Sequence, residues 1–402
     1  MKKLICMLLC LVFVCGSLVA CSEDEYGYKG EYDEYYSPDN RELINLDFYI
    51  IVGEGTTENA IKTVNRMINQ YTSDSKKFTT GITMHYVTAS EYFNTVKAAA
   101  DDTTAARADI VLITGEEMFD YFNDKDLLVN IADYYDSTDF GKIKNNIQST
   151  VLSASYITDG NDKQIFTVPN NNKIDSYDFI LINKAIAEQE YNFGTDKTLT
   201  WNTYEDTKAL RDLVEQFGKY EVEEVVRLVP GGVYSDIAKY EAEGFICNIA
   251  KYPTVTKAEA FKSAFAIVKD NNDKGEFNLD GTPVTPTYDE EGKLISVKAP
   301  EYIERYYRAM EIIYSLNTDV YFRNLLQYGV SGTNYHLVDA TVPDAEKYVI
   351  PVNKGSNVYN MDLLYTGDLF NAYYCEQLGW TDVVYQSIYR QNEESVFPSV
   401  KE

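Results

Sequence analysis

The chain has 402 residues, of which 45% are hydrophobic, and this proportion is ample for packed cores. Its formal net charge is −27, which repels nucleic acid and anionic lipid headgroups and disfavours a polyanionic ligand. Any His-containing catalytic triad or His-rich zinc site would have to use His85 or His336, the two histidines of the chain. The composition therefore predicts a folded protein without a nucleic-acid partner.

The first twenty residues have the layout of a secretory signal peptide. Two lysines follow Met1, and an apolar run from Leu4 to Val14 comes next. This run is shorter than the roughly 17 to 25 residues that a helix needs to cross a bilayer. The sequence Leu-Val-Ala-Cys at 18–21 resembles the lipobox of bacterial lipoproteins, whose cysteine is acylated and becomes the first mature residue. We expect cleavage of residues 1–20 and lipidation of Cys21, with palmitate among the acyl chains; an ordinary signal peptide with a chance cysteine is the alternative.

Residues 21–41 form a polar, acidic segment. The segment is rich in Glu and Asp, contains Gly27, Gly30 and Pro38, and has no apolar periodicity. Such a segment cannot bury enough surface to offset its ordering entropy. It predicts a flexible acidic tether between the lipid and the folded part. With the lipobox resemblance, we expect the protein on the outer face of the cell membrane, in a Gram-positive bacterium.

Strand and helix patterns alternate after residue 41. Apolar residues at helical spacing, such as Ile61, Val64 and Ile68, mark the first helix, and short β-branched runs mark the strands. The expected order is strand 46–52, helix 58–71, strand 82–87, helix 90–100 and strand 109–113. A βαβαβ order requires a parallel sheet with helices on both faces, so the sequence predicts an α/β fold.

The second half of the chain contains a polar break between two strands. A strand-like run over 164–168 stops at Pro169, and a new apolar strand begins at Tyr177. We interpret the break as a crossing between two domains, which the chain length also favours. Further expected elements are helices over 201–217, 301–316 and 319–328, and a hairpin over 284–297.

Two cysteines other than Cys21 remain after removal of the signal peptide. These residues are Cys247 and Cys375. Export permits a disulfide between them, whereas two free buried thiols are equally compatible with the sequence.

Several short segments follow one another in a recognisable order. They are 108–112 (ADIVL) with 127–133 (LLVNIAD), 166–171 (FTVPNN) with 181–184 (LINK), 200–205 (TWNTYE), 324–335 (NLLQYGVSGTNY), and 366–368 (TGD) with 379–380 (GW) and 391–392 (QN). Together they resemble the extracellular solute-binding lipoproteins of bacterial carbohydrate-type ABC importers, the family 1 group of larger lipoprotein sugar binders. The resemblance covers most of residues 42–395; its relatives commonly run on past the last segment.

This resemblance implies a two-lobed periplasmic-binding-protein-like fold of type II, with a ligand cleft between the lobes. Lobe 1 is expected over 42–168 and about 300–345, and lobe 2 over about 172–298 and 346–402. Sugars are recognised by aromatic faces and by amide or carboxylate groups. The candidate ligand-binding residues are Asn170, Asn171, Tyr177, Asn334, Tyr335, Tyr359 and Trp380, each with a structural role as its alternative.

The loop Gly53–Thr56 follows the first strand and leads into a helix. Free N–H groups at such a helix start can meet ligand oxygens, although a plain tight turn is the alternative. The segment Asp270–Gly281 departs from a calcium loop at Lys274 and at Gly281. We therefore expect no metal and no cofactor.

The main hypothesis is a monomeric, lipid-anchored protein that captures a sugar or oligosaccharide and delivers it to the transmembrane subunits of an ABC permease. No enzymatic activity is expected. The alternatives are the same scaffold for a peptide or another polar solute, a surface lipoprotein without transport, and a surface enzyme that acts on polysaccharide.

Overall fold

The computed structural model describes residues 42–73, 78–101, 107–159, 162–192, 204–288, 290–292, 299–338 and 348–397. The signal peptide, the tether with Cys21, and part of the expected hairpin over 284–297 lie outside these residues. Within them, no helix combines the length and the apolar character that crossing a bilayer requires.

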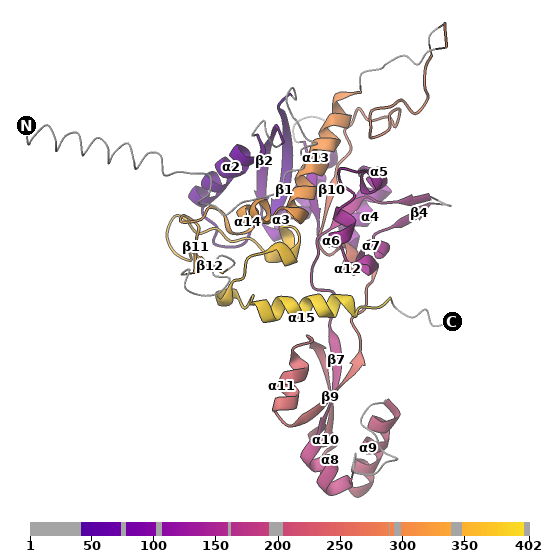
Figure 1. Cartoon of the computed structure of the whole chain (residues 1–402), viewed down its shortest axis with the longest axis vertical. Helices are drawn as coiled ribbons and strands as arrows, with labels where there is room; N and C mark the ends of the chain where they lie inside the picture. The colour runs from indigo at the N-terminus through magenta and orange to yellow at the C-terminus, as the bar shows by residue number, and fades with distance from the viewer. Residues whose placement is uncertain are drawn as a thin grey trace, which may run out of the picture.

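A five-stranded sheet forms the centre of the larger lobe (Figure 1). Its strands, in spatial order, are β2 (Thr80–Val87), β1 (Ile44–Ile51), β3 (Ile110–Ile113), β10 (Ala264–Ile267) and β6 (Thr167–Pro169). Strand β1 runs parallel to β2 and β3, whereas β10 is antiparallel to β3 and β6. The parallel βαβαβ unit predicted from the sequence is therefore confirmed.

Helices pack around this sheet in one continuous hydrophobic core. In α2, Ala60, Val64 and Ile68 are buried at a spacing of four residues, and Thr57 caps the helix by accepting a hydrogen bond from the Ala60 N–H. The helices of this lobe are α2 (Glu58–Thr72), α3 (Ala89–Asp101), α4 (Glu116–Asp124), α5 (Ala132–Asp136), α6 (Ile143–Asn146), α7 (Ser149–Ala154), α12 (Lys257–Phe261), α13 (Glu301–Thr318) and α14 (Val320–Tyr328). A short hairpin joins β4 (Ile157–Asp159) to β5 (Asp162–Gln164).

The smaller lobe contains a three-stranded antiparallel sheet. Strand β7 (Tyr177–Asn183) lies between β8 (Val226–Gly232) and β9 (Phe245–Lys251). Because strand residues alternate between faces, Phe179 packs with α11 while Ile182 packs with the helices at the other face. The helices of this lobe are α8 (Lys184–Tyr191), α9 (Tyr204–Phe217), α10 (Val222–Val225) and α11 (Asp236–Ala242).

The observed division of the chain differs from the expected boundaries at β10. The sequence-based boundaries put residues 264–267 in the second lobe, yet β10 lies between β3 and β6 in the sheet of the first lobe. All four of its side chains are buried, which is typical of a strand inside a sheet covered on both faces. The small-lobe sheet is consequently an insertion, 177–251, between two strands of the larger sheet.

The C-terminal part of the chain ends in a helix that lies between the two lobes. In Figure 1, α15 (Asp382–Glu393) lies between the five-stranded sheet and β7. Before it come the pair β11 (Tyr335–Leu337) and β12 (Val349–Pro351), and the 3-10 turns η3 (Leu363–Tyr365), η4 (Leu369–Asn371) and η5 (Glu376–Leu378). Cys375 is buried near α15, and both it and Cys247 are free thiols.

Candidate functional site

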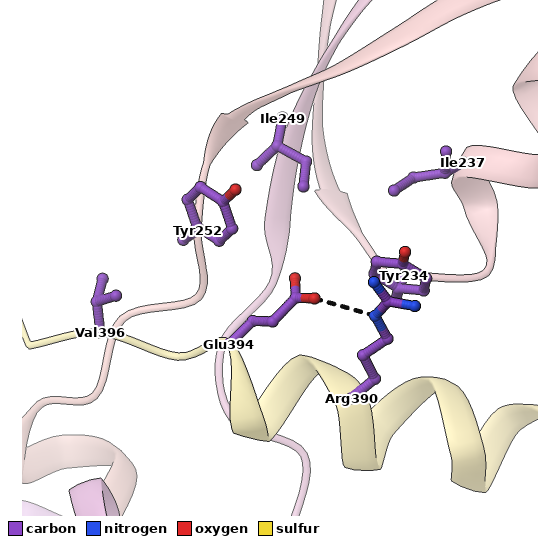
Figure 2. Close-up of a pocket in the computed structure, with 7 residues that line it drawn as sticks. All are labelled: Tyr234, Ile237, Ile249, Tyr252, Arg390, Glu394 and Val396. Carbon is purple, nitrogen blue, oxygen red and sulfur yellow. Dashed lines mark hydrogen bonds and ion pairs between the residues drawn. The ribbon is translucent and has the colours of Figure 1, made fainter.

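A pocket opens where the small lobe meets α15 (Figure 2). Its volume of about 400 Å³ falls within the range of small-molecule sites. Figure 2 shows Arg390 and Glu394 extending from the end of α15 toward Tyr234, with Tyr252 across from them. The lining residues are Tyr234, Ile237, Ile249, Tyr252, Arg390, Glu394 and Val396.

A charged pair forms the polar side of the pocket. The Arg390 Nε donates a hydrogen bond of 3.0 Å to Glu394 Oε1, and the guanidinium carbon lies 3.8 Å from the centroid of the Tyr234 ring. The hydrogen bond to Glu394 raises the pKa of Arg390 above its ordinary, already high value, so the guanidinium stays charged. A cation over an aromatic face is held by the ring's electrostatic field, and this contact joins α15 to the small lobe.

Tyr177 supports both the pair and the aromatic walls. Its hydroxyl donates a hydrogen bond of 2.8 Å to Glu394 Oε2. Burial, and then the neighbouring Glu394 carboxylate, raise the pKa of Tyr177, so its hydroxyl keeps the proton that it donates. The ring of Tyr177 makes edge contacts with Tyr234 and Tyr252, each at a centroid distance of 6.1 Å. Tyr177 thus braces the pocket from the central strand of the small lobe.

Two amide side chains of α15 fix the helix to the crossing between the lobes. The Asn392 Nδ2 donates to the carbonyl oxygen of Asn172 at 2.7 Å, and its Oδ1 accepts from the Ile174 N–H at 3.0 Å. The Gln391 Nε2 donates to the carbonyl oxygens of Ile174 and Asp175 at 2.6 and 2.7 Å. Because Arg390 and Glu394 flank these amides, the pocket lies directly beside the crossing.

Among the candidate residues from the sequence, Tyr177 contacts residues that line this pocket, although it is itself buried behind them. Asn170 is buried and its amide donates to Ser263 Oγ, and the amide of Asn171 donates to the carbonyl oxygen of Asn146. The Asn334 Oδ1 accepts from the Val330 N–H, while its Nδ2 donates to the carbonyl oxygen of Asn357. The amides of Asn171 and Asn334 thus bond backbone groups, and that of Asn170 bonds a side-chain hydroxyl. A ligand-binding role for these three residues stays a prediction.

The remaining three predicted aromatic residues pack elsewhere. Tyr335 is buried in the C-terminal hydrophobic cluster, and Trp380 packs against Tyr385 at a centroid distance of 5.8 Å. The Tyr359 hydroxyl donates to the carbonyl oxygen of Leu326. The sequence-based candidates did not include Tyr234, Tyr252, Arg390 and Glu394. One signal was available, because Arg390 and Glu394 form an i, i+4 charge pair on either side of Gln391 and Asn392.

A segment at 355–360 covers the loop that follows β1. The N–H groups of Gly53 and Thr57 each donate at 2.9 Å, to the carbonyl oxygens of Asn360 and Val358 respectively. The Thr56 hydroxyl also donates to Asn360, and the Thr57 hydroxyl to Ser356. The N–H groups of Gly53 and Thr57 are therefore satisfied within the chain, which leaves the tight-turn interpretation of this loop as the better one.

Gly53 is needed for this close approach. A Cβ at position 53 would lie 2.7 Å from the carbonyl oxygen of Asn360, so Gly53→Ala should destabilise the protein by about 1–3 kcal/mol through overpacking. Urea unfolding followed by circular dichroism measures the change. Gly115→Ala is the control because no atom lies within 4 Å of its added Cβ; equal midpoints for the two variants would contradict the prediction.

Comparisons with known proteins address the fold. No protein-family model matches the sequence, and no curated protein matches it significantly. Among solved structures, the N-glycan transport solute binding protein NgtS from Streptococcus pneumoniae is similar, with a TM-score of 0.51 and 13% identity, over 87% of this chain and 83% of that one. The chain has the two-lobed periplasmic-binding-protein-like fold. This outcome confirms the fold implied by the sequence resemblance.

Two ligand complexes of the same protein are also similar. NgtS with Man1GlcNAc matches at a TM-score of 0.48 and 13% identity, and NgtS with Man5GlcNAc at 0.47 and 12%. Both matches span 87% of this chain and 82% of the other.

Proposed function

We propose that this protein is an extracellular receptor that captures a sugar or oligosaccharide in the pocket between α15 and the small lobe. The observation that carries the proposal is the lining, in which Tyr234 and Tyr252 accompany the Arg390–Glu394 pair. Aromatic faces pack against the C–H faces of sugar rings, and a few fixed polar groups orient the hydroxyls. The similarity in fold to an N-glycan transport solute binding protein supports this assignment.

Delivery to a membrane transporter completes the proposal. Lipidated Cys21 would hold the receptor at the outer face of the membrane, and an ABC permease would accept the sugar from it. The helix α15 contacts both lobes, through Asn392 on the crossing and Arg390 on Tyr234. A ligand bound beside α15 would therefore make different contacts in the open and closed arrangements of the lobes. Such a difference in affinity is what allows a ligand to drive closure.

Binding measurements on the purified chain, residues 22–402, test the proposal. Calorimetry and thermal unfolding with a panel of mono- and oligosaccharides and short peptides should give saturable binding and a raised Tm for a saccharide, without turnover. Binding of peptides alone would favour a peptide receptor, and hydrolysis of a glycan would favour an enzyme. No binding by any member of the panel would contradict sugar capture.

Removal of one aromatic wall should weaken sugar binding. Tyr252 lines the pocket and its ring contacts the Tyr177 ring. Tyr252→Ala should raise the Kd of the bound saccharide about tenfold, because a stacked aromatic face contributes roughly 0.5–1.5 kcal/mol beyond its buried area. Tyr288, which is exposed and does not line the pocket, provides the control. Tyr288→Ala should leave the calorimetric Kd unchanged, and an equal loss in both variants would contradict the prediction.

A further inference from the structure

The guanidinium of Arg390 is held in a fixed plane with part of its bonding capacity unused. Its Nε donates to Glu394, and its plane is supported by the ring of Tyr234. In the described part of the chain, neither terminal nitrogen donates a hydrogen bond. The side chain is 54% exposed and lines the pocket (Figure 2). The two terminal nitrogens, with four N–H groups between them, are therefore available to a molecule that enters.

Each oxygen of the neighbouring carboxylate already accepts a hydrogen bond from a protein donor. Glu394 Oε1 accepts from Arg390, and Oε2 accepts from Tyr177. Glu394 orients the guanidinium through Nε, which leaves the outer edge of the fork for a second partner. A planar fork with two parallel N–H groups matches a carboxylate in a bidentate geometry. The open edge of the guanidinium therefore matches the geometry of a carboxylate better than that of a single hydroxyl.

We propose that Arg390 makes this pocket selective for a saccharide that bears one carboxylate, such as a uronic acid or a sialic acid. The inference rests on the proposed function and names the ligand class for the same pocket. The sugar ring would lie along the tyrosine walls, while its carboxylate pairs with the terminal nitrogens of Arg390. The net charge of −27 opposes a polyanion. At physiological salt, however, exposed charges beyond about 8 Å are largely screened. The binding of a single carboxylate therefore depends mainly on Arg390 and the groups beside it, and not on the net charge of the chain.

Matched saccharide pairs test this selectivity by calorimetry on residues 22–402. The pairs are glucuronic acid with glucose, and 3′-sialyllactose with lactose, so that the two sources of carboxylate are separated. The acidic member of at least one pair should bind about tenfold or more tightly than its neutral partner, as expected for a charge-assisted hydrogen bond. Raising the salt concentration should reduce this difference, because part of it is an ion pair.

Variants of Arg390 distinguish recognition from mere packing. Arg390→Gln should abolish the preference for the acidic sugar, and Arg390→Lys should retain only part of it, because lysine keeps the charge and loses the fork. Arg227→Gln is the matched control, since Arg227 also lies over an aromatic ring, that of Phe245 at 4.7 Å, and does not line the pocket. This control should keep the full preference and its salt dependence.

The outcomes separate the two proposals. Equal binding of the acidic and neutral members to the unmodified protein would overturn the selectivity and leave sugar capture intact. An acidic preference that survives in Arg390→Gln would also overturn the role of Arg390. If none of the four saccharides and no other member of the wider panel bound, sugar capture itself would fail, and the selectivity with it.

Discussion

Asp109→Ala is expected to lower the free energy of unfolding by about 3–5 kcal/mol, the usual cost of breaking a buried ion pair from one side. Asp109 is only 4% exposed and precedes β3. Its carboxylate accepts hydrogen bonds from Arg305 at 2.6 and 3.1 Å, from Arg107 at 3.0 Å, and from the Asp47 N–H at 2.8 Å. Alanine would leave the buried guanidinium of Arg305 without its anion.

Urea unfolding followed by circular dichroism measures this loss. The control is Lys62→Ala, which removes an exposed i, i+4 pair with Glu58; such pairs contribute little to stability, so its midpoint should stay close to that of the unmodified protein. If Asp109→Ala and Lys62→Ala unfolded at the same urea concentration, the buried pair would not stabilise the larger lobe as inferred.

Asn392→Ala should destabilise the protein by about 2–4 kcal/mol and loosen the crossing between the lobes. The substitution removes the partners of the Asn172 carbonyl and the Ile174 N–H, and an unsatisfied buried group costs about 1–3 kcal/mol. Amide hydrogen exchange over residues 170–176 should accelerate, because the Ile174 N–H loses its acceptor. Glu393→Ala, at an exposed position of the same helix, should change neither quantity. Unaltered exchange at Ile174 in Asn392→Ala would contradict the inference that Asn392 holds the crossing in place.

Regular periodicity made the first half of the fold predictable from the sequence. The expected helix over 58–71 is α2, Glu58–Thr72, and the expected strand over 46–52 is β1, Ile44–Ile51. In α2 the buried residues repeat at helical spacing along one side. Strand β1 is instead a short apolar run with consecutive isoleucines, and its last four residues are all buried. Their order also required a parallel sheet, since consecutive strands joined by helices pair in parallel.

Strand β10 lacked such a signal. Its four residues, Ala-Phe-Ala-Ile, are all buried, and a short, uniformly apolar run has no period that separates a strand from a helix. Its place also depends on β3 and β6, because it lies between them and pairs with each in antiparallel orientation. Only tertiary pairing places these residues in the larger lobe, and the sequence-based boundary was misplaced for that reason.

The site was harder to predict because residue type does not distinguish a ligand contact from a structural one. Asn334 and Tyr359 have the chemistry that a sugar pocket uses, yet their polar atoms bond backbone groups of the chain. Arg390 and Glu394 have the spacing of an ordinary surface ion pair on a helix. They line a pocket because the placement of α15 brings them to the tyrosines of the small lobe. This placement is a tertiary feature that the spacing of the two residues does not indicate.

The insertion of the small lobe between β6 and β10 has a consequence for the order of folding. The small lobe's sheet is built from one continuous stretch, whereas the larger lobe requires β10 beside β3, and a hydrogen bond between Thr57 and Val358, 301 positions apart. Closing long loops costs entropy and slows folding. We therefore expect the small lobe to form early. Until β10 is inserted, β3 and β6 present unpaired backbone groups to other chains. The late arrival of this one strand both completes the larger lobe and removes an edge at which neighbouring chains would aggregate.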